Sequence, residues 1–146
     1  MRSDGYDYKL LIIGAGFDSP EAVELKEMAN PNILFIGEKS NVGDYLLNSN
    51  YFVLSSLYEG LPISLLEAMS CGLICISTPA GGVRDVINDS EIGFLSEDFT
   101  IDSFYTTLKS ALQYRNSVVP SAVLSHYVQG YSMNVCADKY QKLYTI

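Results

Sequence analysis

The stretch from Tyr51 to Thr78 constrains the fold more than any other part of the sequence. It begins with a short run of aromatic and β-branched residues, Tyr51–Ser55, and ends with a second apolar run, Leu73–Ser77. Both runs are too short for helices and apolar enough for strands that are buried on both faces. Between them, Leu61–Met69 carries apolar residues at the spacing of a helix with one buried face. The stretch therefore predicts a β-α-β unit.

Both ends of the predicted helix carry typical helix signals. Pro62 fits the first helical turn, because its missing N–H would have no intrahelical partner there and its φ already suits a helix. Gly72 fits the position just past the last turn, where a positive φ is favoured. These two residues predict where the helix begins and ends.

Two carboxylates stand out in this unit. Glu59 lies in the predicted strand-to-helix turn, and Glu67 lies on the helix. Such turns bind anionic ligands in α/β proteins, because free N–H groups and the helix dipole converge there. A plainer interpretation is that Glu59 complements the helix dipole and that Glu67 is a solvated helix residue. The spacing alone leaves both interpretations open.

Strands and helices alternate along the rest of the chain. Further strands are predicted at Tyr8–Ile13, Ile33–Ile36 and Ile92–Ser96, and further helices at Glu21–Ala29, Val42–Asn48, Val83–Ile87, Ile101–Gln113, Val118–Gln129 and Met133–Tyr144. This alternation predicts the α/β class, with a doubly wound, mostly parallel sheet between two layers of helices. A length of 146 residues suits one domain that spans residues 1–146.

Composition argues against several classes of partner. A formal net charge of −8, with only 9 Lys and Arg residues, disfavours nucleic acid and anionic membranes, since both require clustered positive charge. The three cysteines have no zinc-site spacing and are expected to be reduced thiols of a cytoplasmic protein. No apolar run approaches the roughly 18 residues that a transmembrane helix needs.

Two glycine-rich turns follow predicted strands. Gly14-Ala15-Gly16 is similar to the start of a dinucleotide-binding turn, but Ser19 occupies the third glycine position, which disfavours an NAD site. Gly81-Gly82 follows the strand that ends near Ser77. These two glycines favour a tight turn, or they allow a backbone to approach a ligand closely.

The order of these motifs resembles the group 1 glycosyl transferases, also called glycosyltransferase family 4. The resemblance is carried by SLYEGLP at Ser56–Pro62 and LEAMSCG at Leu66–Gly72, with seven residues between the two glutamates. Further segments follow in the family's order at Leu11–Gly16, Ile33–Gly37, Gly81–Ile87 and Gly93–Leu95. The resemblance covers residues from about Tyr8 to about Gln113.

The resemblance implies the nucleotide-sugar-binding C-terminal half of a retaining glycosyltransferase with the GT-B fold. By this carry-over, Glu59 is the catalytic carboxylate beside the transferred sugar, and Glu67 binds the ribose hydroxyls. A carboxylate suits a vicinal diol, because it accepts two charge-assisted hydrogen bonds at once. The other implied donor-binding residues are backbone N–H donors to the diphosphate at Gly60, Leu61, Ile63 and Ser64, the base-contacting Gly37 and Lys39, and Gly81 and Gly82 beside the sugar.

The resemblance also bears on cofactors and on what lies outside the chain. No metal or other cofactor is expected, because helix N–H groups and basic side chains would stabilise the leaving diphosphate and no Asp-x-Asp pair is present. The family's C-terminal half begins with one further strand, followed by an arginine and a lysine, and its N-terminal half binds the acceptor. None of these has a counterpart here. Lys39 and Arg84 are the basic residues at the expected ligand edge, and ordinary surface roles are favoured for both.

In the family, the additional strand lies between the equivalents of Tyr8–Ile13 and Tyr51–Ser55. Without it we expect two unpaired sheet edges. Three alternatives stay open: the two strands pair directly, a neighbouring chain supplies the pairing, or Met1–Asp7 marks an artificial or cleaved end. His126, the single histidine, matches no family position and is expected to have a surface or packing role.

The leading hypothesis is the donor-binding part of a hexosyl transferase for polysaccharide or glycolipid biosynthesis. Its partners would be a nucleoside-diphosphate sugar and, through an N-terminal half outside this chain, a saccharide or lipid-linked acceptor, with peripheral membrane contact allowed in the full enzyme. The competing hypothesis is a non-catalytic interaction module derived from a glycosyltransferase. Tyr127, Tyr131, Tyr140 and Tyr144 could form its partner-facing surface, although packing of these tyrosines onto the sheet is favoured. A sugar-nucleotide epimerase is a third hypothesis, which the glutamate spacing fits poorly. The sequence leaves the nucleotide, the sugar and the acceptor open.

Overall fold

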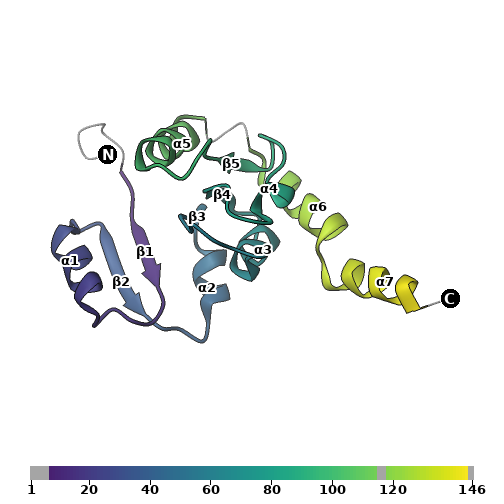
Figure 1. Ribbon diagram of the computed structural model, residues 1–146, viewed down its shortest axis with the longest axis horizontal. Helices are drawn as coiled ribbons and strands as arrows, with labels where there is room; N and C mark the ends of the chain where they lie inside the picture. The colour runs from purple at the N-terminus through teal and green to yellow at the C-terminus, as the bar shows by residue number, and fades with distance from the viewer. Residues whose placement is uncertain (1–6, 115–117, 145–146) are drawn as a thin grey trace. The chain divides into compact units, whose positions relative to one another are not determined.

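The computed structural model describes residues 7–114 and 118–144, which form two compact units with their boundary in the chain between Val42 and Gly43 (Figure 1). The elements are β1 (Leu10–Ile13), α1 (Pro20–Met28), β2 (Ile33–Gly37), α2 (Val42–Leu47), β3 (Tyr51–Leu54), α3 (Ile63–Ser70), β4 (Ile74–Ser77), α4 (Val83–Val86), β5 (Gly93–Leu95), α5 (Ile101–Gln113), α6 (Pro120–Gly130) and α7 (Met133–Tyr144). The predicted alternation of strands and helices is confirmed.

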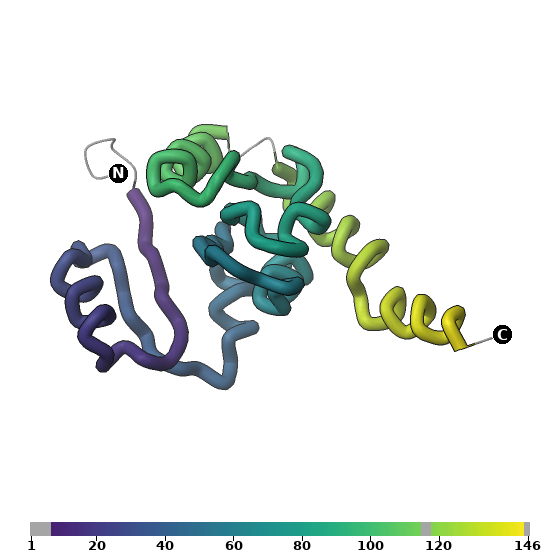
Figure 2. The backbone as a smooth tube through the Cα atoms, viewed as in Figure 1, coloured from purple at the N-terminus to yellow at the C-terminus, as the bar shows by residue number. Residues whose placement is uncertain are grey.

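The N-terminal unit is a single β-α-β element, which the backbone trace of Figure 2 follows from β1 through α1 to β2. The two strands are parallel, with Leu10 opposite Ile33 and a register shift after Ile12. Helix α1 begins as predicted, because the Ser19 Oγ accepts a hydrogen bond from the Ala22 N–H over 3.2 Å. The polar serine therefore ends the loop that follows β1.

The C-terminal unit is built on a parallel sheet in the order β3-β4-β5. All four residues of the central strand β4 are buried. Since successive side chains of a strand point to opposite faces, both faces of β4 are covered. Helix α3 packs against β3 and β4, whereas α5 packs against β4 and β5. The C-terminal unit therefore has the predicted layering of helices on a parallel sheet.

Helix α3 begins slightly later than predicted. Pro62 is the N-cap residue, with an extended ψ of 118°, and Ile63 is the first helical residue. The other end is confirmed, because Gly72 has a φ of +74°. Two hydrogen bonds close this end: the Leu73 N–H donates to the Ala68 carbonyl over 3.1 Å, and the Gly72 N–H donates to that of Met69 over 2.9 Å.

The strands are divided between two sheets. Among the described residues, β1 pairs only with β2, and β3 pairs only with β4. How the edges of β1 and β3 are paired, for which three alternatives are given above, stays a prediction. We expected one domain, whereas the described residues form two compact units.

The predicted C-terminal helices α6 and α7 are present (Figure 1). Their tyrosines divide into two groups by exposure. Tyr127 and Tyr131 pack against the core of the C-terminal unit, whereas Tyr140 and Tyr144 are 60% and 83% exposed. The three cysteines are free thiols, as expected. Within the described part of the chain, no helix has the length and apolarity that crossing a membrane requires.

Candidate functional site

The loop that carries Glu59 is held at its root by the neighbouring strand. Thr78, which is only 3% exposed, follows β4 directly. Its N–H donates to the Leu54 carbonyl over 3.0 Å, and its Oγ1–H donates to the Ser56 carbonyl over 2.5 Å. These two bonds continue the β3–β4 pairing past the end of both strands. The loop between β3 and α3 therefore starts from a fixed position.

The Gly81-Gly82 turn packs directly on the backbone of Glu59 and Gly60. The Gly82 N–H donates to the Gly60 carbonyl over 2.7 Å. A Cβ atom on Gly81 would lie 1.8 Å from the Glu59 carbonyl oxygen, and Gly81 also has a φ of +50°. The glycines are thus required for close packing of one loop on the other, which the sequence could not distinguish from close approach to a ligand.

The two predicted carboxylates occupy different environments. Glu59 is half-buried in its loop, whereas Glu67 is exposed on α3. Among the residues that the structure describes, neither carboxylate has a hydrogen-bonding or ion-pairing partner. Helical spacing places Glu67 on the same face as Ile63 and Ser64, both of which are exposed. The roles assigned to Glu59 and Glu67 stay predictions.

The amino end of α3 offers free donors. No side chain caps this helix, and Pro62 has no N–H. Within the described ranges, the N–H groups of Gly60, Leu61, Ile63 and Ser64 have no acceptor. The unbonded N–H groups of the first helical turn and the positive end of the helix dipole therefore lie next to the Glu59 loop in the chain. Such an arrangement can stabilise a negative charge.

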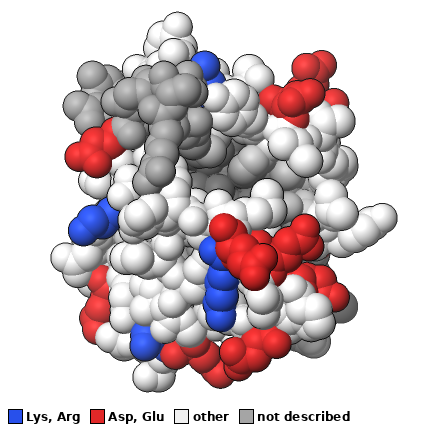
Figure 3. Space-filling model, turned by 90° about the vertical axis from the view of Figure 1, so that its left-hand side faces the viewer, with Lys and Arg blue, Asp and Glu red and all other residues white. Residues whose placement is uncertain are grey.

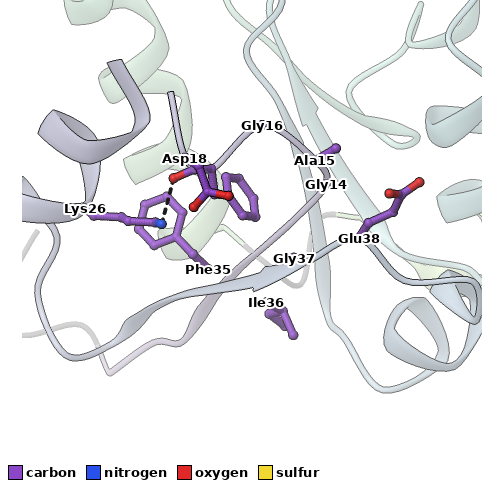
Figure 4. A pocket seen from close by; sticks show the side chains of 10 residues that line it. Gly14, Ala15, Gly16, Asp18, Lys26, Phe35, Ile36, Gly37 and Glu38 are labelled. Carbon is purple, nitrogen blue, oxygen red and sulfur yellow. Dashed lines mark hydrogen bonds between the residues drawn. The ribbon is translucent and has the colours of Figure 1, made fainter. Parts of the chain in front are cut away.

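The N-terminal unit contains a pocket of about 390 Å³ at the carboxyl ends of β1 and β2 (Figure 4). It is lined by Gly14, Ala15, Gly16, Phe17, Asp18, Lys26, Phe35, Ile36, Gly37 and Glu38. Gly16 and Gly37 have φ values of +83° and +79°, and no atom would contact a Cβ on either. Of the two residues predicted to contact the base, Gly37 lines this pocket, whereas Lys39 is not among the lining residues.

Lys26 lines this pocket and is a candidate ligand-binding residue that the sequence analysis did not identify. Its Nζ donates to the Phe17 carbonyl over 2.7 Å and lies 5.9 Å from the centre of the Phe17 ring. Figure 4 shows Lys26 beside Asp18, with Glu38 pointing away from both. The sequence placed Lys26 on a helix, but only the turn before α1 brings Phe17 within its reach. A lysine has three donors, so Lys26 retains hydrogen-bonding capacity beyond this contact.

The predicted site residues are divided between the two units. Gly37 and Lys39 belong to the N-terminal unit, and all the others belong to the C-terminal unit. Within the C-terminal unit, the structure brings Glu59 and Gly60 together with Gly81 and Gly82. On the face shown in Figure 3, acidic side chains form clusters and basic ones are scattered, in keeping with the net charge of −8.

His126 has the packing role that was expected. Its Nε2 lies 3.0 Å from the Val86 carbonyl, and its ring packs 5.6 Å from that of Tyr131. In the parts of the chain that are described, no three His, Cys, Asp or Glu side chains come close enough to hold a metal ion.

Comparison with known proteins identifies the family. A family model described as "Glycosyl transferases group 1" matches residues 1–119. The chain belongs to this family. This group 1 chain also has the Rossmann-like α/β fold of GT-B glycosyltransferases, as its likeness to Anabaena HepE in complex with UDP and glucose shows. That likeness has a TM-score of 0.77 at 14% sequence identity, and it covers 94% of this chain and 41% of HepE.

Two curated relatives illustrate the family's range. The N-acetyl-alpha-D-glucosaminyl L-malate synthase of Bacillus anthracis is 36% identical over 96 residues, which are 62% of this chain and 24% of that protein. The UDP-Gal:alpha-D-GlcNAc-diphosphoundecaprenol alpha-1,3-galactosyltransferase of Escherichia coli is 32% identical over 113 residues, which are 77% of this chain and 29% of that protein. The group 1 chain therefore spans less than a third of the length of either relative.

Proposed function

We propose that this chain is the donor-binding part of a retaining hexosyl transferase that uses a nucleoside-diphosphate sugar. The observation that carries the proposal is the packing of the Glu59-Gly60 loop on Gly81-Gly82, beside the uncapped amino end of α3. Family membership supports it, and so do the names of the relatives, one of which specifies UDP-galactose as its donor. The polysaccharide and lipid-linked products of such relatives make a saccharide or lipid-linked acceptor the proposed partner.

The diphosphate binds at the amino end of α3 in this proposal. The free N–H groups of Gly60, Leu61, Ile63 and Ser64 are the donors, and the helix dipole adds a favourable field. When the bond between the anomeric carbon and the diphosphate breaks, its electron pair leaves with the diphosphate oxygen. Donors that already point at the diphosphate stabilise this developing negative charge effectively, because they need not reorient during the reaction. No metal ion is needed for this role.

The sugar and the ribose lie on either side of this anion site. Glu59, backed by Gly81 and Gly82, accepts hydrogen bonds from the sugar hydroxyls, and its negative charge favours the positive charge that develops at the anomeric carbon. Glu67 accepts hydrogen bonds from the two ribose hydroxyls. The acceptor hydroxyl then bonds to the anomeric carbon on the face that the diphosphate leaves, and its proton passes to the departing diphosphate. Configuration at the anomeric carbon is thereby retained.

Within the N-terminal unit, Gly37 and Lys39 stay the proposed contacts of the base. Gly37 lines the pocket of this unit, and no atom lies within 4 Å of the position that a Cβ on Gly37 would occupy. Phe17 and Phe35 supply aromatic surface to the same pocket, with their ring centres 5.3 Å apart. Lys39 is half-buried and follows the pocket-lining residues Gly37 and Glu38. We assign the enzyme to the cytoplasm, where nucleotide sugars are available as donors.

Calorimetric titration of the chain with UDP-, GDP- and ADP-glucose tests the proposal. We expect one of these donors to bind, and Glu67→Gln to weaken that binding by about tenfold, the effect of losing roughly 1.4 kcal/mol of charge-assisted hydrogen bonding. Glu91→Gln is the matched control, because Glu91 is an exposed carboxylate of the same unit. Full binding by Glu67→Gln would show that the ribose site is wrongly placed.

A second candidate function is supported by one observation. Tyr140 and Tyr144 of α7 are exposed, which favours a non-catalytic interaction module. A folded chain that binds none of the three nucleotide sugars would favour this module over the transferase. Far-UV circular dichroism with the expected helix content would show that the chain is folded in that experiment.

A further inference from the structure

Helix α4 is a single turn that has little means of fixing its own orientation. It spans four residues, so most of its carbonyl groups have no intrahelical partner. Val83 and Val86 are fully buried and attach the turn to the core. Burial is non-directional, however, so it leaves the rotation of a short turn poorly determined. Directional contacts must supply the remaining constraint.

Two side chains of the α6 segment supply those contacts. His126 lies with its Nε2 3.0 Å from the Val86 carbonyl, and the Tyr131 hydroxyl donates to the Asp85 carbonyl over 2.9 Å. The Asn88 side chain adds a longer contact of 3.4 Å to the same Asp85 carbonyl. Desolvation, and then the negative charge of Asp85, raise the pKa of Tyr131, so its hydroxyl stays a donor across the physiological range.

The other end of α4 contacts the Glu59 loop. Gly82, the N-cap residue of α4, donates to the Gly60 carbonyl over 2.7 Å. The Asp85 N–H donates in turn to the Gly82 carbonyl over 3.1 Å. A continuous series of hydrogen bonds thus runs from Tyr131 through Asp85 and Gly82 to Gly60. A rotation of α4 would shift Gly82 and, with it, the backbone that carries Glu59.

We propose that His126 and Tyr131 are positioning residues for the sugar-binding half of the donor site. They hold the carboxyl end of α4, and α4 in turn holds the Glu59-Gly60 backbone through Gly82. This inference rests on the proposed function for its effect on sugar binding. The coupling of α6 to Gly82 through α4 is a property of the ligand-free chain, so it can be measured without a ligand.

The first measurement is amide hydrogen exchange of the ligand-free chain, resolved by NMR. Tyr131→Phe removes the hydroxyl and keeps the ring, and His126→Ala removes the contact to Val86. We expect both to accelerate exchange at Gly82 about tenfold while the amides of β4 keep their rates. His126→Gln should restore slow exchange, because its amide can donate to the same carbonyl. Tyr127→Phe is the control on the same helix, since among the described residues the Tyr127 hydroxyl has no partner.

The second measurement compares the affinities of UDP and UDP-glucose. We expect Tyr131→Phe and His126→Ala to lower the affinity for UDP-glucose severalfold and to leave the affinity for UDP unchanged. A merely structural role would weaken both ligands equally, by lowering the folded fraction. Unchanged exchange at Gly82 in both variants, or equal weakening of both ligands, would overturn the inference. If the two variants accelerate exchange at Gly82 in a chain that binds none of UDP-, GDP- and ADP-glucose, the proposed function is overturned and the α6–α4 linkage is supported.

Discussion

The Gly82 N–H and the Gly60 carbonyl are joined by a hydrogen bond of 2.7 Å, which links the loops that follow β4 and β3. In a parallel sheet, the carboxyl ends of neighbouring strands meet at one edge, so these loops begin side by side. The bond turns that proximity into a fixed arrangement. Glu59 is therefore carried by a backbone that is held at Thr78 and again at Gly82.

Replacing Gly81 by alanine should separate the two loops. A Cβ at this position would lie 1.8 Å from the Glu59 carbonyl oxygen, and the φ of +50° adds backbone strain. We expect Gly81→Ala to lower the free energy of unfolding by about 2 kcal/mol or more, as measured by urea denaturation. Gly60→Ala is the control, because no atom lies near its Cβ position, and it should change stability by less than about 1 kcal/mol. Equal stabilities of the two variants would contradict the close packing.

The hydroxyl group of Thr78 should account for most of the contribution of this side chain to stability. Thr78→Val keeps the shape of the side chain and leaves the Ser56 carbonyl without its donor. We expect a loss of about 1–3 kcal/mol in the free energy of unfolding, the cost of a polar group left unsatisfied. Thr78→Ser retains the hydroxyl and should recover most of that loss. A serine variant as unstable as the valine variant would show that the methyl group matters instead.

The buried face of α3 should dominate the stability of the C-terminal unit. Leu65 is fully buried, whereas Ile63, two residues earlier, is 72% exposed. Leu65→Ala should cost about 2–5 kcal/mol, because it removes apolar contacts and leaves a cavity. Ile63→Ala should lie within about 0.5 kcal/mol of the wild type. Thermal or urea unfolding of the two variants side by side checks the orientation of the helix.

The Cys75 thiol should give the protein a pH-dependent loss of stability in alkali. Burial raises the pKa of Cys75 from 9.0 to about 12. The unfolded thiol ionises first, so the stabilising contribution is complete below pH 9 and is lost as pH rises towards 12. At pH 10.5 the loss from this one group is about 2 kcal/mol.

Cys75→Ala should therefore show a smaller fall in unfolding free energy between pH 8 and pH 10.5 than the wild type. Cys136→Ala is the matched control, because Cys136 is exposed and its variant should keep the wild-type slope. Thiol labelling gives a second check, with Cys136 reacting in the folded protein and Cys75 reacting only after unfolding. Rapid labelling of Cys75 under native conditions would contradict its burial.

Local sequence patterns predicted most individual elements, because their signals lie within a few residues. Ser19 begins α1 and Gly72 ends α3 as their sequence positions indicated, since capping depends on the chemistry of one or two side chains. Helix α3 starts at Ile63, later than predicted, because a proline fits both the N-cap position, which Pro62 occupies, and the first helical position. Residue patterns also identified Glu59 and Glu67 as candidates, but patterns carry no information on distance.

The contacts that shape the candidate site join residues far apart in the chain, and the sequence alone could not supply them. The bonds from Gly82 to Gly60, from Thr78 to Ser56 and from Tyr131 to Asp85 exist only after the strands have paired and α6 has packed. The sequence by itself determined the α/β class and the ends of several helices, through periodicity and capping. Tertiary structure alone decided that the glycines serve loop packing and that the strands form two sheets, because both depend on which distant backbones come within hydrogen-bonding reach.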